Sequence, residues 1–177
     1  LALGSSTWKQ TEWESAGNLE GWTSTGVTAP VVAGGMISGT SSSADPVLQR
    51  ANISDGPDLD LAFNDYVDLR IQLPATYTGD VQLYFGVTDG GGAEGNLTPV
   101  LTGFSSDRMV TLPNASIVKD GAFHTYRIDM ALEPWWRGKL NDLRIDPATV
   151  SGTAFAVDFV RIGDTGVVPT AQGMSDL

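Results

Sequence analysis

Hydrolytic enzymes often use histidine, and this chain has one, His124. A Ser-His-Asp set would have to use this side chain as its general base. His124 lies inside a strand-like run, between Phe123 and Thr125, and no sharp nucleophile turn is nearby. The sequence therefore predicts a packed or hydrogen-bonded strand residue. The chain has no cysteine, which excludes thiolate catalysis and cysteine-based metal sites.

Carboxylates are plentiful, and a suitably spaced pair could hydrolyse a glycosidic bond. Nothing in the sequence singles out one acid whose surroundings would raise its pKa. Asp146 precedes Pro147, and this pairing at the end of a strand is common in turns. The sequence therefore does not favour a hydrolase or a lyase. The candidate acids are Asp129, Glu133, Asp142, Asp146 and Asp158.

One of these acids, Asp158, interrupts an otherwise apolar run at residues 155–162. A buried carboxylate needs a partner, which can be a cation, a salt bridge or backbone hydrogen bonds. Calcium takes several oxygen ligands, from carboxylates, amides and backbone carbonyls. An acidic segment near the N-terminus could supply some of them, from Glu12, Glu14, Asn18 and Glu20.

Tryptophan and tyrosine side chains could bind sugars, because each has an apolar ring face and a polar group. Trp22 and Trp136 lie beside or close to glycines at strand or turn junctions, where a buried packing anchor is the favoured interpretation. Adjacent side chains in an extended segment point in different directions. If Trp136 is buried, we expect Trp135 to be exposed, near Arg137 and Lys139.

Two runs, residues 66–73 and 80–87, carry apolar side chains at every second position, so each has an apolar and a polar face. The link Pro74–Gly79 is short enough for a hairpin, which would place the two strands side by side. Their polar faces would then form either a sugar-binding surface or an ordinary solvated face. The side chains concerned are Arg70, Gln72, Gln82 and Tyr84.

Short strands separated by turns account for most of the chain. Gly34-Gly35 predicts a tight hairpin turn, and the glycine-rich segment Asp89–Asn96 is a predicted loop without the ligand spacing of an EF-hand. No run predicts a helix of ordinary length. We expect an all-β fold, an antiparallel two-sheet β-sandwich or jelly roll, over residues 1–164, with 165–177 as a linker or tail. Further predicted strands are residues 7–14, 108–112, 123–130, 140–146 and, as a central buried strand, 155–162.

The balance of charge limits the partners of this chain. Its 177 residues carry a net charge of −11 at pH 7, from 21 acidic and 10 basic residues. Nucleic acids and anionic membranes attract basic surfaces, so neither is an expected partner. No apolar run approaches the ~20 residues of a membrane span. No signal peptide is visible, and a removed signal, or excision from a larger protein, would leave the same sequence.

Several short motifs occur in an order that is known from one family. The main motifs are Glu20-Gly21-Trp22, Asp120-Gly121 with Phe123-His124 and Tyr126, Pro134 with Trp136 and Gly138, Leu143–Pro147, and Val157–Ile162. Weaker matches at Gly39, Asp45-Pro46 and Tyr84-Phe85 extend the pattern over nearly the whole chain. In this combination, the sequence resembles carbohydrate-binding modules of the galactose-binding-like β-sandwich type, which are appended to secreted bacterial polysaccharide-degrading enzymes.

The resemblance implies a jelly roll with a bound structural calcium ion (Ca2+), served by Glu14 and Asp158. It also implies that a polysaccharide binds either at the loop rim, where Trp135 is the candidate, or on a concave sheet face. Three arginines on that face would hint at an acidic glycan. The candidates for the concave face are Arg70, Gln72, Gln82, Tyr84, Arg127 and Arg144.

The expected function is therefore that of a non-catalytic carbohydrate-binding module, outside the cell or at its surface. It would hold an attached glycoside hydrolase or polysaccharide lyase close to its substrate. The alternative is a structural or adhesive spacer in a secreted multidomain protein, with no sugar site of its own. An exposed cluster of aromatic side chains would favour the module, and a smooth polar face would favour the spacer.

Overall fold

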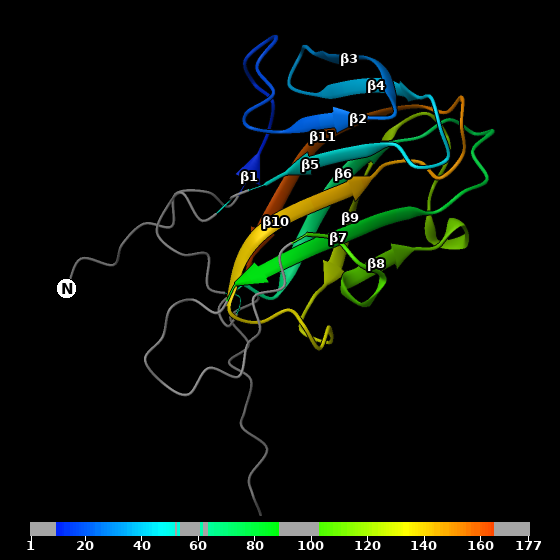
Figure 1. Cartoon of the computed structure of the whole chain (residues 1–177). Coiled ribbons are helices and arrows are strands. Elements are labelled where there is room, and N and C mark those ends of the chain that lie inside the picture. The colour runs from blue at the N-terminus through cyan, green and yellow to red at the C-terminus, as the bar shows by residue number, and fades with distance from the viewer. Residues whose placement is uncertain (1–9, 52, 54–60, 62–63, 89–102, 165–177) are drawn as a thin grey trace, which may run out of the picture.

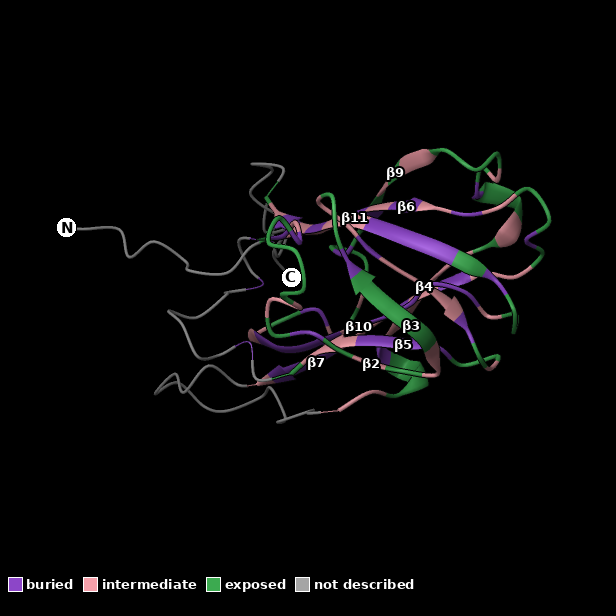
Figure 2. Cartoon of the chain, turned by 90° about the horizontal axis from the view of Figure 1, so that it is seen from above, coloured by how far each residue is buried: buried purple, intermediate pink, exposed green. Residues whose placement is uncertain are grey.

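A computed structural model describes residues 10–51, 53, 61, 64–88 and 103–164, which form two antiparallel sheets packed face to face (Figures 1 and 2). This arrangement confirms the predicted all-β sandwich. Sheet A contains, in spatial order, β3 (Val27–Val32), β4 (Ile37–Ser41), β11 (Ala154–Gly163), β6 (Tyr66–Gln72) and β9 (Phe123–Asp129), and β1 (Gln10–Thr11) also pairs with β11. Sheet B contains β2 (Thr23–Thr25), β5 (Val47–Arg50), β10 (Lys139–Asp146), β7 (Val81–Thr88) and β8 (Met109–Leu112).

Two single helical turns are described in full, η3 (Ser106–Arg108) and η4 (Asn114–Ser116). None of the described helical segments has the length and apolar character required to cross a membrane. The predicted loop Asp89–Asn96 and the predicted tail at residues 165–177 lie outside the described residues, as does the start of the predicted strand at residues 7–14. Residues 10–14 of that prediction are described: β1 covers Gln10–Thr11, and residues 12–14 are not in a strand, so that end of the prediction is wrong.

The core lies between the two sheets and follows the predicted alternation. On β6 and β7, every second side chain points inwards and is buried, while the side chains between them are half-buried on the outer faces. Burying one such leucine, valine or phenylalanine contributes about 1.5–3 kcal/mol. Figure 2 shows β9, β6 and β11 in one layer and β10, β5 and β7 in the other. The inward residues of β6 and β7 are Val67, Leu69, Ile71, Val81, Leu83, Phe85 and Val87.

The expected hairpin between β6 and β7 is wrong, because β6 belongs to sheet A and β7 to sheet B. The connection crosses from one layer to the other, and Tyr77 lies buried at the corner, where its backbone N–H donates to Pro74 O at 3.0 Å. Each strand buries its apolar face against the other sheet. As a consequence, the polar faces of β6 and β7 lie on opposite sides of the molecule.

Two other local predictions are confirmed. Gly34 and Gly35 have φ angles of +63° and +76° and connect β3 to β4. Two successive left-handed residues are the signature of a type I′ hairpin turn, and glycine adopts them without strain. The Ala33 N–H donates to Met36 O at 3.1 Å across this turn. β11 is the central buried strand of sheet A, as its apolar composition predicted.

Two tryptophans near the N-terminus anchor that end of the sandwich. Trp22 is buried, as predicted, and its Nε1–H donates to Thr11 Oγ1 at 2.9 Å. The Trp13 ring is fully buried beside it, with 5.7 Å between the ring centroids. Thr11 lies on β1, so this contact fixes the first described strand against the core.

Candidate functional site

An arginine stacks on an aromatic side chain at the centre of the outer face of sheet B. Tyr84 on β7 lies directly opposite Arg144 on β10 in the antiparallel register, and Gln49 on β5 is opposite Arg144 on its other side. The Arg144 guanidinium carbon lies 4.7 Å from the centroid of the Tyr84 ring and 5.9 Å from that of Phe104. A guanidinium over a ring face is a favourable cation–π contact. The strands thus hold an arginine and two aromatic side chains together on one face of the sheet.

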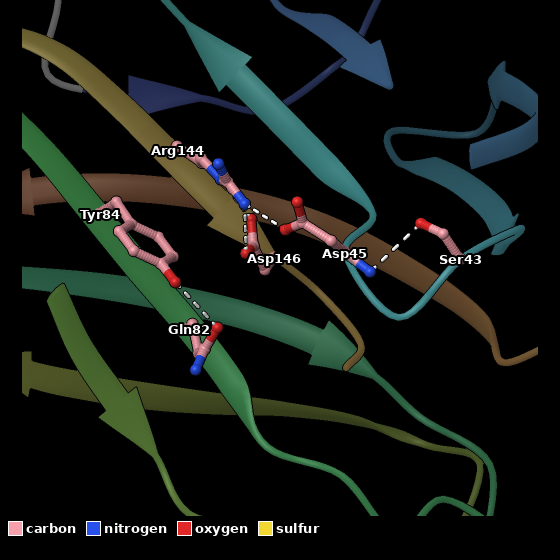
Figure 3. Close-up of polar contacts among 6 residues, drawn as sticks. All are labelled: Ser43, Asp45, Gln82, Tyr84, Arg144 and Asp146. Atoms are coloured by element: carbon pink, nitrogen blue, oxygen red, sulfur yellow. Dashed lines mark hydrogen bonds and ion pairs between the residues drawn. The ribbon is translucent and has the colours of Figure 1, made fainter. Parts of the chain in front are cut away.

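Two carboxylates hold the Arg144 guanidinium in this position (Figure 3). Asp146 is two residues along the same strand, so both side chains point to the same face of the sheet. Asp146 accepts from Arg144 Nε at 2.6 Å and from an Arg144 terminal nitrogen at 2.7 Å. Asp45, in the loop between β4 and β5, forms a second ion pair with the same guanidinium. The positive charge of Arg144 is therefore neutralised within the site.

Burial sets the electrostatics of this cluster. The Asp146 side chain is only 2% exposed, and its burial raises the pKa of the carboxyl group, although the hydrogen bond from Arg144 opposes that rise. The hydrogen bond with Asp146 in turn raises the pKa of Arg144. Burial also raises the pKa of Tyr84. Tyr84 is therefore a neutral phenol at physiological pH, and its hydroxyl donates to Gln82 Oε1 at 3.1 Å.

The structure divides the predicted concave-face residues between two faces. Gln82, Tyr84 and Arg144 come together on sheet B. The expectation that all six share one face is wrong, because the connection after β6 crosses between the layers. The outer face of sheet A carries the other three, which are Arg70, Gln72 and Arg127.

On sheet A, both predicted arginines are paired with carboxylates and lie over aromatic rings. Arg127 donates to the two oxygens of Asp68 at 2.8 and 2.7 Å, and its guanidinium carbon lies 3.8 Å from the Tyr66 ring centroid. The hydrogen bonds that Arg127 donates to Asp68 raise the pKa of Arg127. Arg70 is the second of these arginines. Its nitrogen lies 2.5 Å from an Asp158 oxygen, and its guanidinium carbon lies 5.3 Å from the Phe123 ring centroid.

The partner of Asp158 is thus an arginine, which was one of the alternatives open from the sequence. Asp158 lies at a bulge of β11, where the pairing with β6 shifts register, and its side chain is partly exposed. Glu14 is exposed. In the described part of the chain, no three His, Cys, Asp or Glu side chains lie close enough to hold a metal ion together. These side chains do not fit a carboxylate-rich calcium site, so the calcium ion stays a prediction.

The adjacent tryptophans divide their roles largely as predicted. Trp136 is 6% exposed, its Nε1–H donates to Asn64 O at 2.6 Å, and its ring meets the Phe85 ring edge-on at 5.0 Å. The predicted packing anchor is confirmed. Trp135 is half-buried against the core rather than fully exposed, and the Arg137 guanidinium carbon lies 5.0 Å from its ring centroid. Its contact with a sugar stays a prediction.

The structure also tests the prediction that His124 is a packed or hydrogen-bonded strand residue. It lies on β9, and its Nε2 is 2.9 Å from Asp120 Oδ1, which confirms a hydrogen-bonded strand residue. Phe104 and Asp45 also belong to the sheet B cluster, although neither was among the predicted site residues. Phe104 lies outside any alternating run, so no periodic signal marked it. The spacing of Arg144 and Asp146 on one strand was a readable signal for their pairing.

Comparisons with known proteins place this fold. No family model matches the sequence, and no curated protein matches it. A mutant family 29 carbohydrate-binding module complexed with mannohexaose has 10% identity and a TM-score of 0.50, covering 84% of this chain and 85% of its own. A mutant of the same module complexed with cellulohexaose has 10% identity and a TM-score of 0.51, covering 87% and 92%.

A third structure, described as "CBM4 structure and function", has 8% identity and a TM-score of 0.52, covering 86% of this chain and 96% of its own. At such low identity, a likeness of structures shows a shared fold. The chain is therefore a two-sheet β-sandwich of the kind found in carbohydrate-binding modules.

Proposed function

We propose that this chain is a non-catalytic carbohydrate-binding module that binds a neutral polysaccharide on the outer face of sheet B. The carrying observation is the cluster of Tyr84, Phe104 and Arg144 at the centre of the sheet. Two structures of the same fold hold mannohexaose and cellulohexaose, which are uncharged sugar chains. Their ligands support the class of ligand proposed for this chain.

The surface offers both kinds of contact that a sugar needs. Tyr84 and Phe104 meet edge to face at 6.5 Å between ring centroids, and they give the sheet face apolar area for the C–H groups of a sugar ring. Gln82 accepts from Tyr84 through its oxygen, which leaves its amide N–H groups for sugar hydroxyls. Because these side chains are already fixed to one another, little side-chain freedom is lost on binding.

The charges of the described residues favour a neutral ligand over the acidic glycan suggested by the arginines. Arg70, Arg127 and Arg144 each have a carboxylate partner, and Arg144 has two. An acidic sugar over Arg144 would meet one positive and two negative charges, in a chain whose net charge is −11. Hydrogen bonding to a neutral sugar leaves these ion pairs intact.

Affinity electrophoresis tests this proposal, with native gels that contain glucomannan, mixed-linkage β-glucan or, as an acidic comparison, alginate. We expect the neutral polysaccharides to retard the wild-type chain and Tyr84→Ala to abolish the retardation. Tyr66→Ala is the matched control, because Tyr66 also lies beneath an arginine but on sheet A. Retardation that survives Tyr84→Ala would place the site elsewhere. A folded chain that no polysaccharide retards would favour the spacer.

The wider role follows from this binding. Attachment to a glycan-degrading catalytic domain outside the cell would hold the enzyme beside its substrate and raise the effective concentration of that substrate. Size-matched fusions to a glycoside hydrolase, with and without Tyr84→Ala, test this role. We expect the intact module to increase hydrolysis of insoluble glucomannan and to leave hydrolysis of a soluble oligosaccharide unchanged.

A further inference from the structure

A groove of about 350 Å³ opens on the outer face of sheet A, on the opposite side of the sandwich from Tyr84. Its floor is one row of residues in register across three strands. Ala156 on β11 lies between Ser38 on β4 and Gln72 on β6. The other residues that line it are Met36, Pro74, Gly121, Ala154 and Phe155.

The groove exists because the outward side chains here are small. Ala154 and Ala156 alternate with Phe155 and Val157, which point into the core. Farther along the same outer face, the sheet carries bulky side chains such as Arg70. Ala156 is only 5% exposed although it lies on the outer face, which shows that the walls of the groove rise around it.

Polar groups lie on both sides of this apolar floor. The Gln72 side-chain N–H donates to the Gly121 carbonyl, which fixes the amide and leaves its oxygen facing no protein donor among the described residues. The Ser38 hydroxyl likewise has no hydrogen-bond partner in the described part of the chain. Two interstrand spacings separate Ser38 from Gln72, or about 10 Å. That span accommodates one sugar ring with hydroxyl groups on both sides.

We propose that this groove is a second carbohydrate site, which binds a single neutral sugar unit at a chain end or a branch. The sugar ring packs over the Ala156 methyl group, and its hydroxyls bond to Ser38 and Gln72. None of the lining side chains is charged, and the nearby Arg70 is paired with Asp158, so the site fits an uncharged ligand. The volume lies near the lower end of the usual range for ligand pockets.

The groove and the Tyr84 surface lie on opposite outer faces, so one module can hold two sugar chains at once. The groove proposal takes from the proposed function only the class of ligand, a neutral sugar. Each site can be tested without the other, because their residues lie on different sheets. A bivalent module of this kind would bridge neighbouring chains of a polysaccharide and bind it with avidity.

Backbone-amide NMR of the ¹⁵N-labelled chain tests the groove, with titrations of mannose, glucose and galactose at millimolar concentrations. We expect at least one sugar to shift the Ser38, Ala156 and Gly121 amides and the Gln72 side-chain amide in a saturable way. Ala156→Leu should fill the groove and abolish these shifts. Ala115→Leu is the matched control, because Ala115 is exposed on η4 and does not line the groove.

A second variant, Ser38→Ala with Gln72→Ala, removes the polar groups without adding volume and should weaken binding at least tenfold. The proposal is overturned if no sugar shifts the groove amides of the folded wild-type chain. It is also overturned if the shifts are unchanged in Ala156→Leu. A parallel titration with cellohexaose reports on Tyr84. If cellohexaose shifts the resonances near Tyr84 but no sugar shifts the groove amides, the second site alone is overturned. If a sugar shifts the groove amides but cellohexaose shifts nothing near Tyr84, the sheet B site alone is overturned.

Discussion

Removing the guanidinium of Arg144 should destabilise the chain far more than removing that of Arg127, although both arginines form two hydrogen bonds to one aspartate. The Arg144 side chain is 17% exposed and its partner Asp146 2%, whereas the Arg127 side chain is 56% exposed. Arg144→Met keeps an apolar stem over Tyr84 and leaves Asp146 as a buried, unpaired carboxylate. Breaking a buried pair in this way costs about 3–5 kcal/mol. That is a large part of the ~5–15 kcal/mol that stabilises an ordinary domain.

The cost should depend on pH in a defined direction. Without Arg144, nothing opposes the rise in the pKa of Asp146 that burial causes. The folded state then binds the Asp146 proton more tightly than the unfolded chain does, so folding is favoured below the unfolded pKa of about 3.9 and loses stability as pH rises through the folded pKa. The loss in Arg144→Met should therefore be large at neutral pH and small near pH 4.

Urea unfolding followed by tryptophan fluorescence measures these free energies. Arg127→Met is the matched control and should change stability little, because water screens an exposed pair. Adding Asp146→Asn to Arg144→Met removes the stranded charge and should recover most of the lost stability. Equal losses in Arg144→Met and Arg127→Met, or a loss at neutral pH that does not shrink near pH 4, would refute the reasoning.

Four further outcomes are expected. Trp136→Phe should cost about 1–3 kcal/mol in thermal or urea unfolding, because the buried hydrogen bond from the indole N–H to the Asn64 carbonyl is lost. In the wild-type chain, the raised pKa of Asp146 lowers stability as pH rises above about 4, so Asp146→Asn should flatten that dependence. Trp135→Ala should weaken glycan binding if the rim takes part, with circular dichroism confirming the fold. If the predicted calcium ion is bound, EDTA should lower the Tm, since a ligand of the native state stabilises that state.

The alternation of side chains was enough to predict the strands and their inward faces. Val67, Leu69 and Ile71 are buried because a period of two places them on one side of an extended chain. The pair Gly34-Gly35 predicted its turn for an equally local reason, the need for two left-handed residues. Such features depend on neighbours in sequence, which the amino-acid sequence displays directly.

The candidate site was less predictable, because it depends on contacts between distant parts of the chain. A period of two says which side of a strand is apolar but not which sheet the strand joins, so Arg70 and Tyr84 were wrongly placed on one face. Asp158 faces Arg70 at a bulge that breaks the alternation, 88 residues away along the chain. Asp45 reaches Arg144 across 99 residues. No local pattern announces either pair.

The position of Arg144 between two carboxylates affects how ligand binding depends on ionic strength. A site that attracts its ligand by net charge weakens as salt screens that charge, over a Debye length of about 10 Å at 0.1 M. Here Arg144 is paired with carboxylates inside the site, and the proposed ligand carries no charge. Binding should therefore be almost constant from dilute buffer to the salinity of brine. A module of this kind would retain its affinity for a polysaccharide at salt concentrations at which proteins that bind by net charge dissociate.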